Sequence, residues 1–167
     1  TQTGGSNISG GISERVRFQQ GGGISFNGDT AAANALDDYE EGTFTPAVTS
    51  GLSAGQIAYN SRSGKYTKVG NTVHVTFHMN ISSASLDGGA LKFGGLPFTS
   101  VNSTNLTGGF SILVSTGNIP STDTYRVVAN STDVQVVTGA GDARGANTTT
   151  INAGNRTLSY FGFYFVS

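Results

Sequence analysis

The sequence has no cysteine and no tryptophan, and only 11% of its 167 residues are charged. The absence of cysteine excludes a disulfide scaffold, a thiolate nucleophile and a cysteine-ligated metal site. Nine basic residues are balanced by ten acidic ones, so a net charge of −1 gives no electrostatic reason to expect nucleic-acid binding. No apolar run approaches the roughly 20 residues of a membrane-spanning helix, and the first residues lack the basic and apolar regions of a signal peptide. We therefore expect no nucleic-acid partner and no membrane insertion.

Small and hydroxylated residues are abundant instead. The chain holds 25 glycines, and Ser, Thr and Asn make up most of its polar residues. This composition favours short strands, many turns and hydroxyl-rich surfaces over helices. The length suits one ordinary domain with an appendage.

The first 28 residues contain apolar residues only in short alternating pairs between glycine clusters. Val16 alternates with Phe18, and Ile24 with Phe26. Such pairs bury little apolar surface until several copies of the chain associate. We interpret residues 1–28 as a stalk segment in which chains intertwine; a disordered linker is the alternative.

The stretch "DTAAANALDDYEE", residues 29–41, predicts the one helix of the chain. Asp29 or Thr30 would be its N-cap, alanines fill its body, and Gly42 is placed to end it. We therefore assign residues 29–42 to a helical neck. Its acidic residues lie in the last turn, where they oppose the helix dipole, so they must serve something other than helix stability. These residues are Asp37, Asp38, Glu40 and Glu41.

Residues 43–167 have the pattern of an antiparallel β domain, the predicted head. In "TVHVTFHMNI", residues 72–81, apolar and polar residues alternate strictly, and Gly70 and Asn71 before it suit a two-residue hairpin turn. Further strands are indicated by "FTPAVT", "QIAYN", "ALKF", "GFSILVS", "TYRVVAN", "DVQVVT" and "RTLSYFGFYFV". The fold class is therefore all-β, an antiparallel, jelly-roll-like β-sandwich of about eight or nine strands.

The last predicted strand is apolar on both faces. Phe161, Phe163 and Phe165 alternate with residues of the opposite face, which include Tyr160, Tyr164 and Val166. One face can pack on the sandwich core. The simplest partner for the other is a neighbouring subunit.

Several short motifs suggest catalysis or phosphate binding without supporting context. "GLSAG", residues 51–55, matches a nucleophile elbow with Ser53, but the elbow needs a strand and a helix of an α/β sheet. "GAGDARG", residues 139–145, has one residue too many for a dinucleotide-binding loop, and no helix follows it. The acids of "DDYEE" are adjacent on a neck, so they form no cleft for glycoside hydrolysis and no calcium loop. We predict no catalytic residue.

His74 and His78 are the only histidines, and both belong to the polar face of the strand at residues 72–81. Near a threefold axis, three copies of one histidine could ring a metal ion. The alternative is that both are ordinary residues of a hydroxyl-rich face beside Thr72 and Thr76. No carboxylate has a matching spacing, so we predict no metal site and no cofactor.

Three stretches together resemble a known family. "GGISFNGDTAAANALDDYEEGTFTPAVT", "GKYTKVGNTVHVTFHMNIS" and "GALKFGGLPFTS" are similar to the C-terminal, receptor-binding portion of bacteriophage tail fibres, especially those of marine phages. The resemblance runs from about Ile12 to Ser100, and the remainder matches only in β character and in its aromatic last strand.

The resemblance implies a homotrimeric virion protein, made in the cytoplasm of the host bacterium, with the rest of the tail fibre preceding it. The distal head of such a protein binds the host surface, either a polysaccharide or an outer-membrane receptor. We predict a trimer interface in stalk, neck and last strand. It comprises Arg15, Arg17, Phe18, Phe26, Leu36, Phe161, Phe163 and Phe165. Arg15 and Arg17 are the only bases in the first 61 residues, so we expect them to pair with the acids of "DDYEE" from a neighbouring chain.

Receptor binding is expected in two loops of the head, "NIPSTDTYR" and "GAGDARGANT". An aromatic ring can stack on a sugar, guanidinium groups can bind acidic groups, and amides and carboxylates can bind hydroxyls. The candidates are Asn118, Asp123, Tyr125, Arg126, Asp142, Arg144 and Asn147. A receptor-binding tip is the favoured function; a glycan depolymerase or esterase head and a purely structural trimerisation module are the alternatives.

Overall fold

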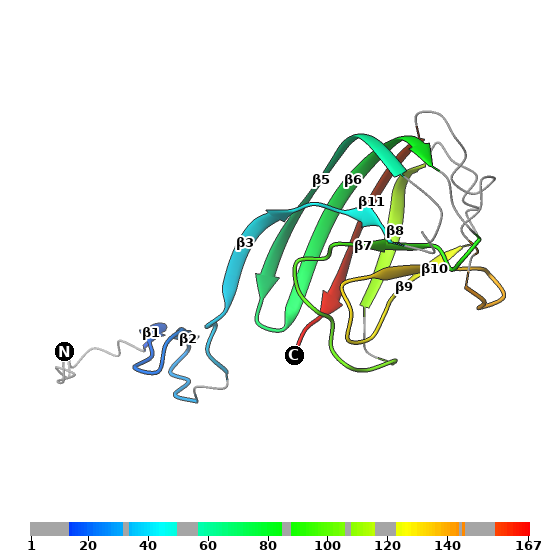
Figure 1. Cartoon of the computed structure of the whole chain (residues 1–167). Helices are drawn as coiled ribbons and strands as arrows, with labels where there is room; N and C mark the ends of the chain where they lie inside the picture. Colours follow the sequence, from blue (N-terminus) through cyan, green and yellow to red (C-terminus); the bar gives the residue numbers. More distant parts are fainter. Residues whose placement is uncertain are drawn as a thin grey trace, which may run out of the picture. The chain divides into compact units, whose positions relative to one another are not determined.

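The structure is a computed structural model that describes residues 14–31, 34–49, 57–84, 88–105, 108–115, 123–143, 145 and 156–167. The chain divides into two compact units, Thr1–Tyr39 and Glu40–Ser167. Figure 1 shows the strands of both units along the chain. No described helix is long and apolar enough to cross a membrane.

The described part of the first unit is a small antiparallel hairpin. Strand β1 (Val16–Phe18) pairs with β2 (Ile24–Phe26), and two glycines with positive φ, Gly22 at 99° and Gly23 at 80°, complete the turn between them. Leu36 then forms an isolated antiparallel bridge with Ile24 through two backbone hydrogen bonds of 2.8 and 2.9 Å. A hairpin of this size is too small to bury a hydrophobic core, and the side chain of Phe18 remains 80% exposed.

The predicted helix at residues 29–41 is wrong. Asp29 accepts hydrogen bonds from the backbone N–H of Ala31 at 2.8 Å and from the side chain of Asn34 at 2.7 Å, and these bonds lower the pKa of its carboxyl. Asp29 thus caps a turn, as an N-cap would, but the described chain then returns to extended structure at Leu36. A single alanine-rich turn is too short to hold a helix alone, and backbone pairing with Ile24 is available instead.

The acidic end of the same stretch is a strand. Strand β3 (Tyr39–Phe44) includes Glu40 and Glu41 and belongs to the second unit's five-stranded sheet. The ring of Tyr66 packs directly against Gly42, where a Cβ would meet ring atoms at 2.6 Å. Its hydroxyl donates a short hydrogen bond to Glu40, and this bond raises the pKa of Tyr66. Gly42 therefore makes room for an aromatic ring and ends no helix, and the sheet begins at Tyr39 inside the predicted neck.

Two antiparallel sheets form the second unit, which confirms the all-β sandwich. One has the order β3-β5-β6-β11-β8, and the other β4-β7-β10-β9. Among the described strands of the second unit, only β5–β6 and β9–β10 connect neighbours in one sheet, and every other connection crosses between the two sheets, as in a jelly roll. The bounds are Ala47–Val48 (β4), Ile57–Val69 (β5), Thr72–Ala84 (β6), Lys92–Gly94 (β7), Gly108–Ser115 (β8), Thr124–Val127 (β9), Val134–Val137 (β10) and Arg156–Phe165 (β11).

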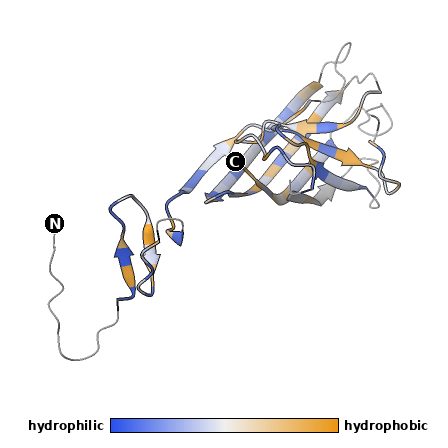
Figure 2. Cartoon of the chain, turned by 90° about the horizontal axis from the view of Figure 1, so that it is seen from below, coloured by the Kyte–Doolittle hydropathy of each residue, from blue (hydrophilic) through white to orange (hydrophobic). Residues whose placement is uncertain are grey.

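The hairpin β5–β6 is formed as the sequence predicts. Val69 pairs with Thr72 across a turn at Gly70 and Asn71, and Gly70 has a φ of 56°. The alternation in β6 also holds, since every second residue is buried in the core. Figure 2 shows the same alternation of hydrophilic and hydrophobic residues along the strands. The buried set is Val73, Val75, Phe77, Met79 and Ile81.

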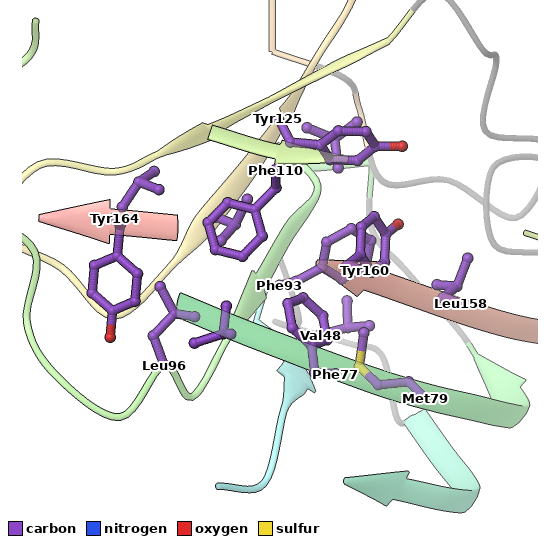
Figure 3. Packing of buried hydrophobic residues seen from close by; sticks show 14 of the residues in the cluster. Val48, Phe77, Met79, Phe93, Leu96, Phe110, Tyr125, Leu158, Tyr160 and Tyr164 are labelled. Carbon is purple, nitrogen blue, oxygen red and sulfur yellow. The ribbon is translucent and has the colours of Figure 1, made fainter. Parts of the chain in front are cut away.

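Aromatic rings fill the space between the two sheets. Tyr160 of β11 is fully buried, and its ring centroid lies 5.0 to 5.1 Å from those of Phe77, Phe93 and Tyr125 (Figure 3). Phe77 and Tyr160 come from the five-stranded sheet, and Phe93 and Tyr125 from the other. This cluster therefore joins the two sheets, and it fixes which face of β11 is inside.

Candidate functional site

The outer face of the five-stranded sheet carries side chains in rows that cross the strands. In one row Lys65 of β5 lies opposite Thr76 of β6, which lies opposite Phe161 of β11. In the next row Thr67, His74 and Phe163 are paired in the same way. Facing side chains in neighbouring strands lie close enough to act together. The face is thus polar over β5 and β6, and aromatic over β11.

The aromatic part of this face is exposed. Phe161 is 47% exposed and Phe163 42%, whereas the large side chains on the opposite face of β11 are buried. Phe163 packs edge-on against Phe165 with ring centroids 5.7 Å apart, and the ring of His74 lies 6.1 Å from Phe163. We call Phe161, Phe163 and Phe165 the aromatic stripe.

An open groove crosses the polar part of the face and ends at the stripe. Its volume is about 670 Å³, within the range of small-ligand sites. Side chains from four strands line it, because β3 adds Glu41 and Thr43 to the rows already described. We call this the polar groove. Its exposed or half-buried side chains are Glu41, Thr43, Lys65, Tyr66, Thr67, His74, Thr76 and Phe161.

The two histidines are residues of this hydroxyl-rich face. His78 Nδ1 lies 3.0 Å from the hydroxyl of Ser159, and its Nε2 lies 3.5 Å from that of Ser61. His74 packs on Phe163 in the other row. Both of these partners of His78 are hydroxyl groups, whereas a metal-binding histidine is often oriented by a carboxylate. The residues that the structure describes include no group of three or more potential metal ligands.

The structure describes four of the seven predicted receptor-binding residues, Asp123, Tyr125, Arg126 and Asp142. Asn118, Arg144 and Asn147 lie outside the described residues. Tyr125 is only 9% exposed, with its ring packed edge-on against Tyr160, so the prediction that it stacks on a sugar is wrong. Asp123 beside it is buried as well.

Arg126 and Asp142 are exposed and take part in local structure, Arg126 through its side chain and Asp142 through its backbone. Arg126 donates a 2.7 Å hydrogen bond to Gln135 on the neighbouring strand. Asp142 forms a turn with Thr138, whose backbone N–H donates to the Asp142 carbonyl at 2.7 Å. The turn at "GAGDARG" is therefore an ordinary loop in its described part. Ser53 of "GLSAG" lies outside the described residues.

The predicted interface residues are exposed in a single chain. Phe26 and Leu36 in the first unit are 51% and 41% exposed, and Phe161 and Phe163 in the second are similarly so, while Phe165 is half-buried. Arg15 is exposed too, but Arg17 forms an ion pair of 2.6 Å with Glu14 of its own chain, which raises the pKa of the guanidinium. Arg17 thus has a partner within the chain.

Sequence reasoning missed the polar groove. Its residues come from three stretches, 41–43, 65–67 and 74–76, together with Phe161 and Gly162, about 85 residues further on. No spacing within one stretch reveals them. The sequence did show the polar face of residues 72–81. It did not show which residues of the neighbouring strands lie beside that face.

Comparisons with known proteins place the fold. No family model and no curated protein matches the sequence. Among solved structures, the chain is similar to the crystal structure of the Dettilon tailspike protein (gp208), with a TM-score of 0.61 and 21% sequence identity. The match covers 76% of this chain and 24% of that chain, so the chain spans about a quarter of the tailspike's length. About three quarters of this chain therefore has a fold that is found in a phage tail protein.

Proposed function

We propose that this chain is the distal part of a trimeric phage tail fibre or tailspike, and that it attaches the virion to a glycan on the host cell surface. The outer face of the five-stranded sheet carries the proposal. It combines the aromatic stripe, which suits association with another subunit, with a groove of hydroxyls and charges, which suits binding of a polar ligand.

Two separate surfaces support association of chains. The hairpin of the first unit exposes Phe18, Phe26 and Leu36 and has no core to hold it. The stripe exposes Phe161 and Phe163 on the outer face of the five-stranded sheet. Assembly of three chains, as the resemblance to tail fibres implies, would bury the exposed residues of the hairpin and the part of the stripe around Phe163.

The likeness to a tailspike supports a place in the virion tail, with synthesis in the host cytoplasm and the remaining fibre joined to the first unit. Attachment needs no strong single site. Three copies per trimer, and several fibres per particle, raise the effective concentration of each weak site.

Adsorption to bacteria tests the proposal. The labelled full chain is incubated with a panel of bacterial strains, before and after periodate oxidation of surface sugars, while its mass in solution is measured by light scattering. We expect a trimer that adsorbs to some strains and loses adsorption after periodate. A monomer at micromolar concentration, or adsorption abolished by protease and untouched by periodate, would contradict the trimer or the glycan respectively.

The same incubation separates binding from cleavage. Purified polysaccharide from an adsorbing strain is assayed for new reducing ends and for released acetate. We expect neither product. Their appearance would favour a depolymerase or an esterase, and failure to adsorb to any strain would favour a purely structural module.

A further inference from the structure

We propose that the polar groove on the outer face of the five-stranded sheet is the saccharide-binding site, in place of the loops favoured by the sequence. This inference rests on the proposed function, because it names the site through which attachment occurs. The occupant we assign is a neutral, hydroxyl-rich saccharide.

The groove has the groups that such a ligand needs. A sugar presents hydroxyls around its ring edge and a patch of C–H groups on its face. Phe161 is exposed at one end of the groove, where its ring can cover that apolar face. Three threonine hydroxyls can each donate and accept a hydrogen bond. These are the hydroxyls of Thr43, Thr67 and Thr76.

The charges of the groove favour a neutral ligand. Lys65 supplies a cationic donor and Glu41 an anionic acceptor, and the two come from different strands. Hydrogen bonds to charged groups are stronger than those between neutral groups, and both charges can bind sugar hydroxyls. With one charge of each sign, the groove has no net preference for a strongly acidic polysaccharide.

The groove is built on a rigid support. Lys65, Thr76 and Phe161 are held in one row by continuous pairing of β5, β6 and β11. Beneath this row the opposite face of the sheet packs into the core through Phe77 and Tyr160. A site on paired strands loses little conformational freedom when it binds, which helps a weak polar ligand.

Association through the stripe leaves the groove open. The stripe lies on β11, with Phe163 and Phe165 following Phe161 along that strand. The groove instead extends across β6 and β5 to β3, at the opposite edge of the sheet from β8. A neighbouring copy seated on β11 therefore borders the groove at Phe161 and leaves Thr43 and Lys65 accessible.

A double variant tests the site. Lys65→Ala with Thr67→Val removes two polar groups that the fold does not need, and Lys92→Ala on β7 of the other sheet is the charge-matched control. The probe is polysaccharide purified from a strain to which the wild-type trimer adsorbs. We expect the double variant to bind it at least about tenfold more weakly, and the control to bind as the wild type does. Melting temperatures and trimer mass should stay unchanged in both.

The outcomes separate this inference from the proposed function. If the wild type adsorbs to no strain, the proposed function fails and the site falls with it. If the wild type adsorbs and the double variant binds equally well, the groove is not the binding site, and the proposed attachment function is retained.

A cysteine probe tests whether the groove is open in the assembled protein. Because the chain has no cysteine, Thr67→Cys introduces a unique thiol in the groove. We expect it to react with a maleimide in the trimer and to be protected by the same polysaccharide. A thiol that is unreactive in the trimer would mean that another copy covers the groove, which would overturn the proposal.

Discussion

The two faces of strand β11 differ in how far their aromatic side chains are exposed. On the inner face Tyr160 and Tyr164 are completely buried, and on the outer face Phe161 and Phe163 remain nearly half exposed. All four side chains are large and aromatic, and they alternate along a few residues of one strand. Composition therefore does not decide which aromatic residues form the core.

What differs is the partner that each face finds within the chain. The inner rings meet Phe93 and Tyr125 from the opposite sheet, whereas the outer rings meet no second layer of the described chain. The inner face therefore explains the stability of a subunit. We propose that the outer face serves association and ligand binding.

The largest expected effect comes from removing a ring on the inner face. Phe77 is 2% exposed and contacts the rings of Phe44, Phe110 and Tyr160. Phe77→Ala should lower the free energy of unfolding by about 3–5 kcal/mol, because it leaves a cavity in a closely packed core. Denaturant unfolding followed by circular dichroism measures the change. A loss below about 1 kcal/mol would mean that the core is not packed as described.

Phe163 is the matched residue on the outer face, 42% exposed on the same sheet. We expect Phe163→Ala to preserve the β-sheet spectrum of the subunit, since little core is lost. The variant should instead dissociate at protein concentrations where the wild type remains assembled, because the stripe supplies apolar contact area. Analytical ultracentrifugation over a dilution series detects this.

The control for assembly is a polar residue of the same face, Ser159→Ala, which lies beside His78 and four residues before Phe163 on β11. It should dissociate as the wild type does. If Phe163→Ala left the assembly constant unchanged, the stripe would not be an interface, and the contrast between the two faces would lose its functional meaning.

The sequence predicted the sandwich well because its strands alternate clearly. The apolar face of residues 72–81 and the turn at Gly70 and Asn71 are local features, and both are present. The predicted helix at residues 29–41 is wrong because its local helix propensity is outweighed by contacts with residues elsewhere in the sequence. Local sequence patterns do not reveal these contacts. Leu36 pairs with Ile24, and Gly42 receives the ring of Tyr66.

The candidate site was much harder to predict. Exposed loops are a reasonable place to expect ligands, yet Tyr125, the aromatic residue of the first loop, belongs to the core. The groove depends on the register that places Lys65 and Phe161 on either side of Thr76. Pairing between β6 and β11 spans some eighty residues of chain, and no local pattern fixes it.

Alkaline pH should act on the inner face. Burial raises the pKa of Tyr164 to about 12 and raises that of Tyr160 well above its usual value, whereas unfolded tyrosines titrate near 10. The folded state therefore retains protons that the unfolded state releases above about pH 10. We expect the free energy of unfolding to be level below that pH and to fall as the pH rises from about 10 toward 12.

Denaturant unfolding at several alkaline pH values measures this decline, and Tyr164→Phe should make it shallower by removing one titrating group. The Glu40 bond raises the pKa of Tyr66 in the same direction, so some decline should remain in that variant. A free energy of unfolding that stays constant through this range would show that the tyrosines ionise without unfolding the core.

The smallest effect distinguishes two tyrosines that are equally buried. The hydroxyl of Tyr164 accepts a hydrogen bond of 3.1 Å from the backbone N–H of Phe98, while that of Tyr160, which interacts electrostatically with Tyr125, makes no hydrogen bond of normal geometry with the described residues. Figure 3 shows the two hydroxyls pointing to different ends of the cluster. Tyr164→Phe should cost about 1 kcal/mol, because it leaves the part-buried N–H of Phe98 without this hydrogen bond. Tyr160→Phe should be neutral or slightly stabilising, because it removes a buried polar group and keeps the ring. Equal losses in the two variants would mean that the Tyr160 hydroxyl is hydrogen-bonded in solution, and that the inner face of β11 is held by polar contacts at both ends as well as by its rings.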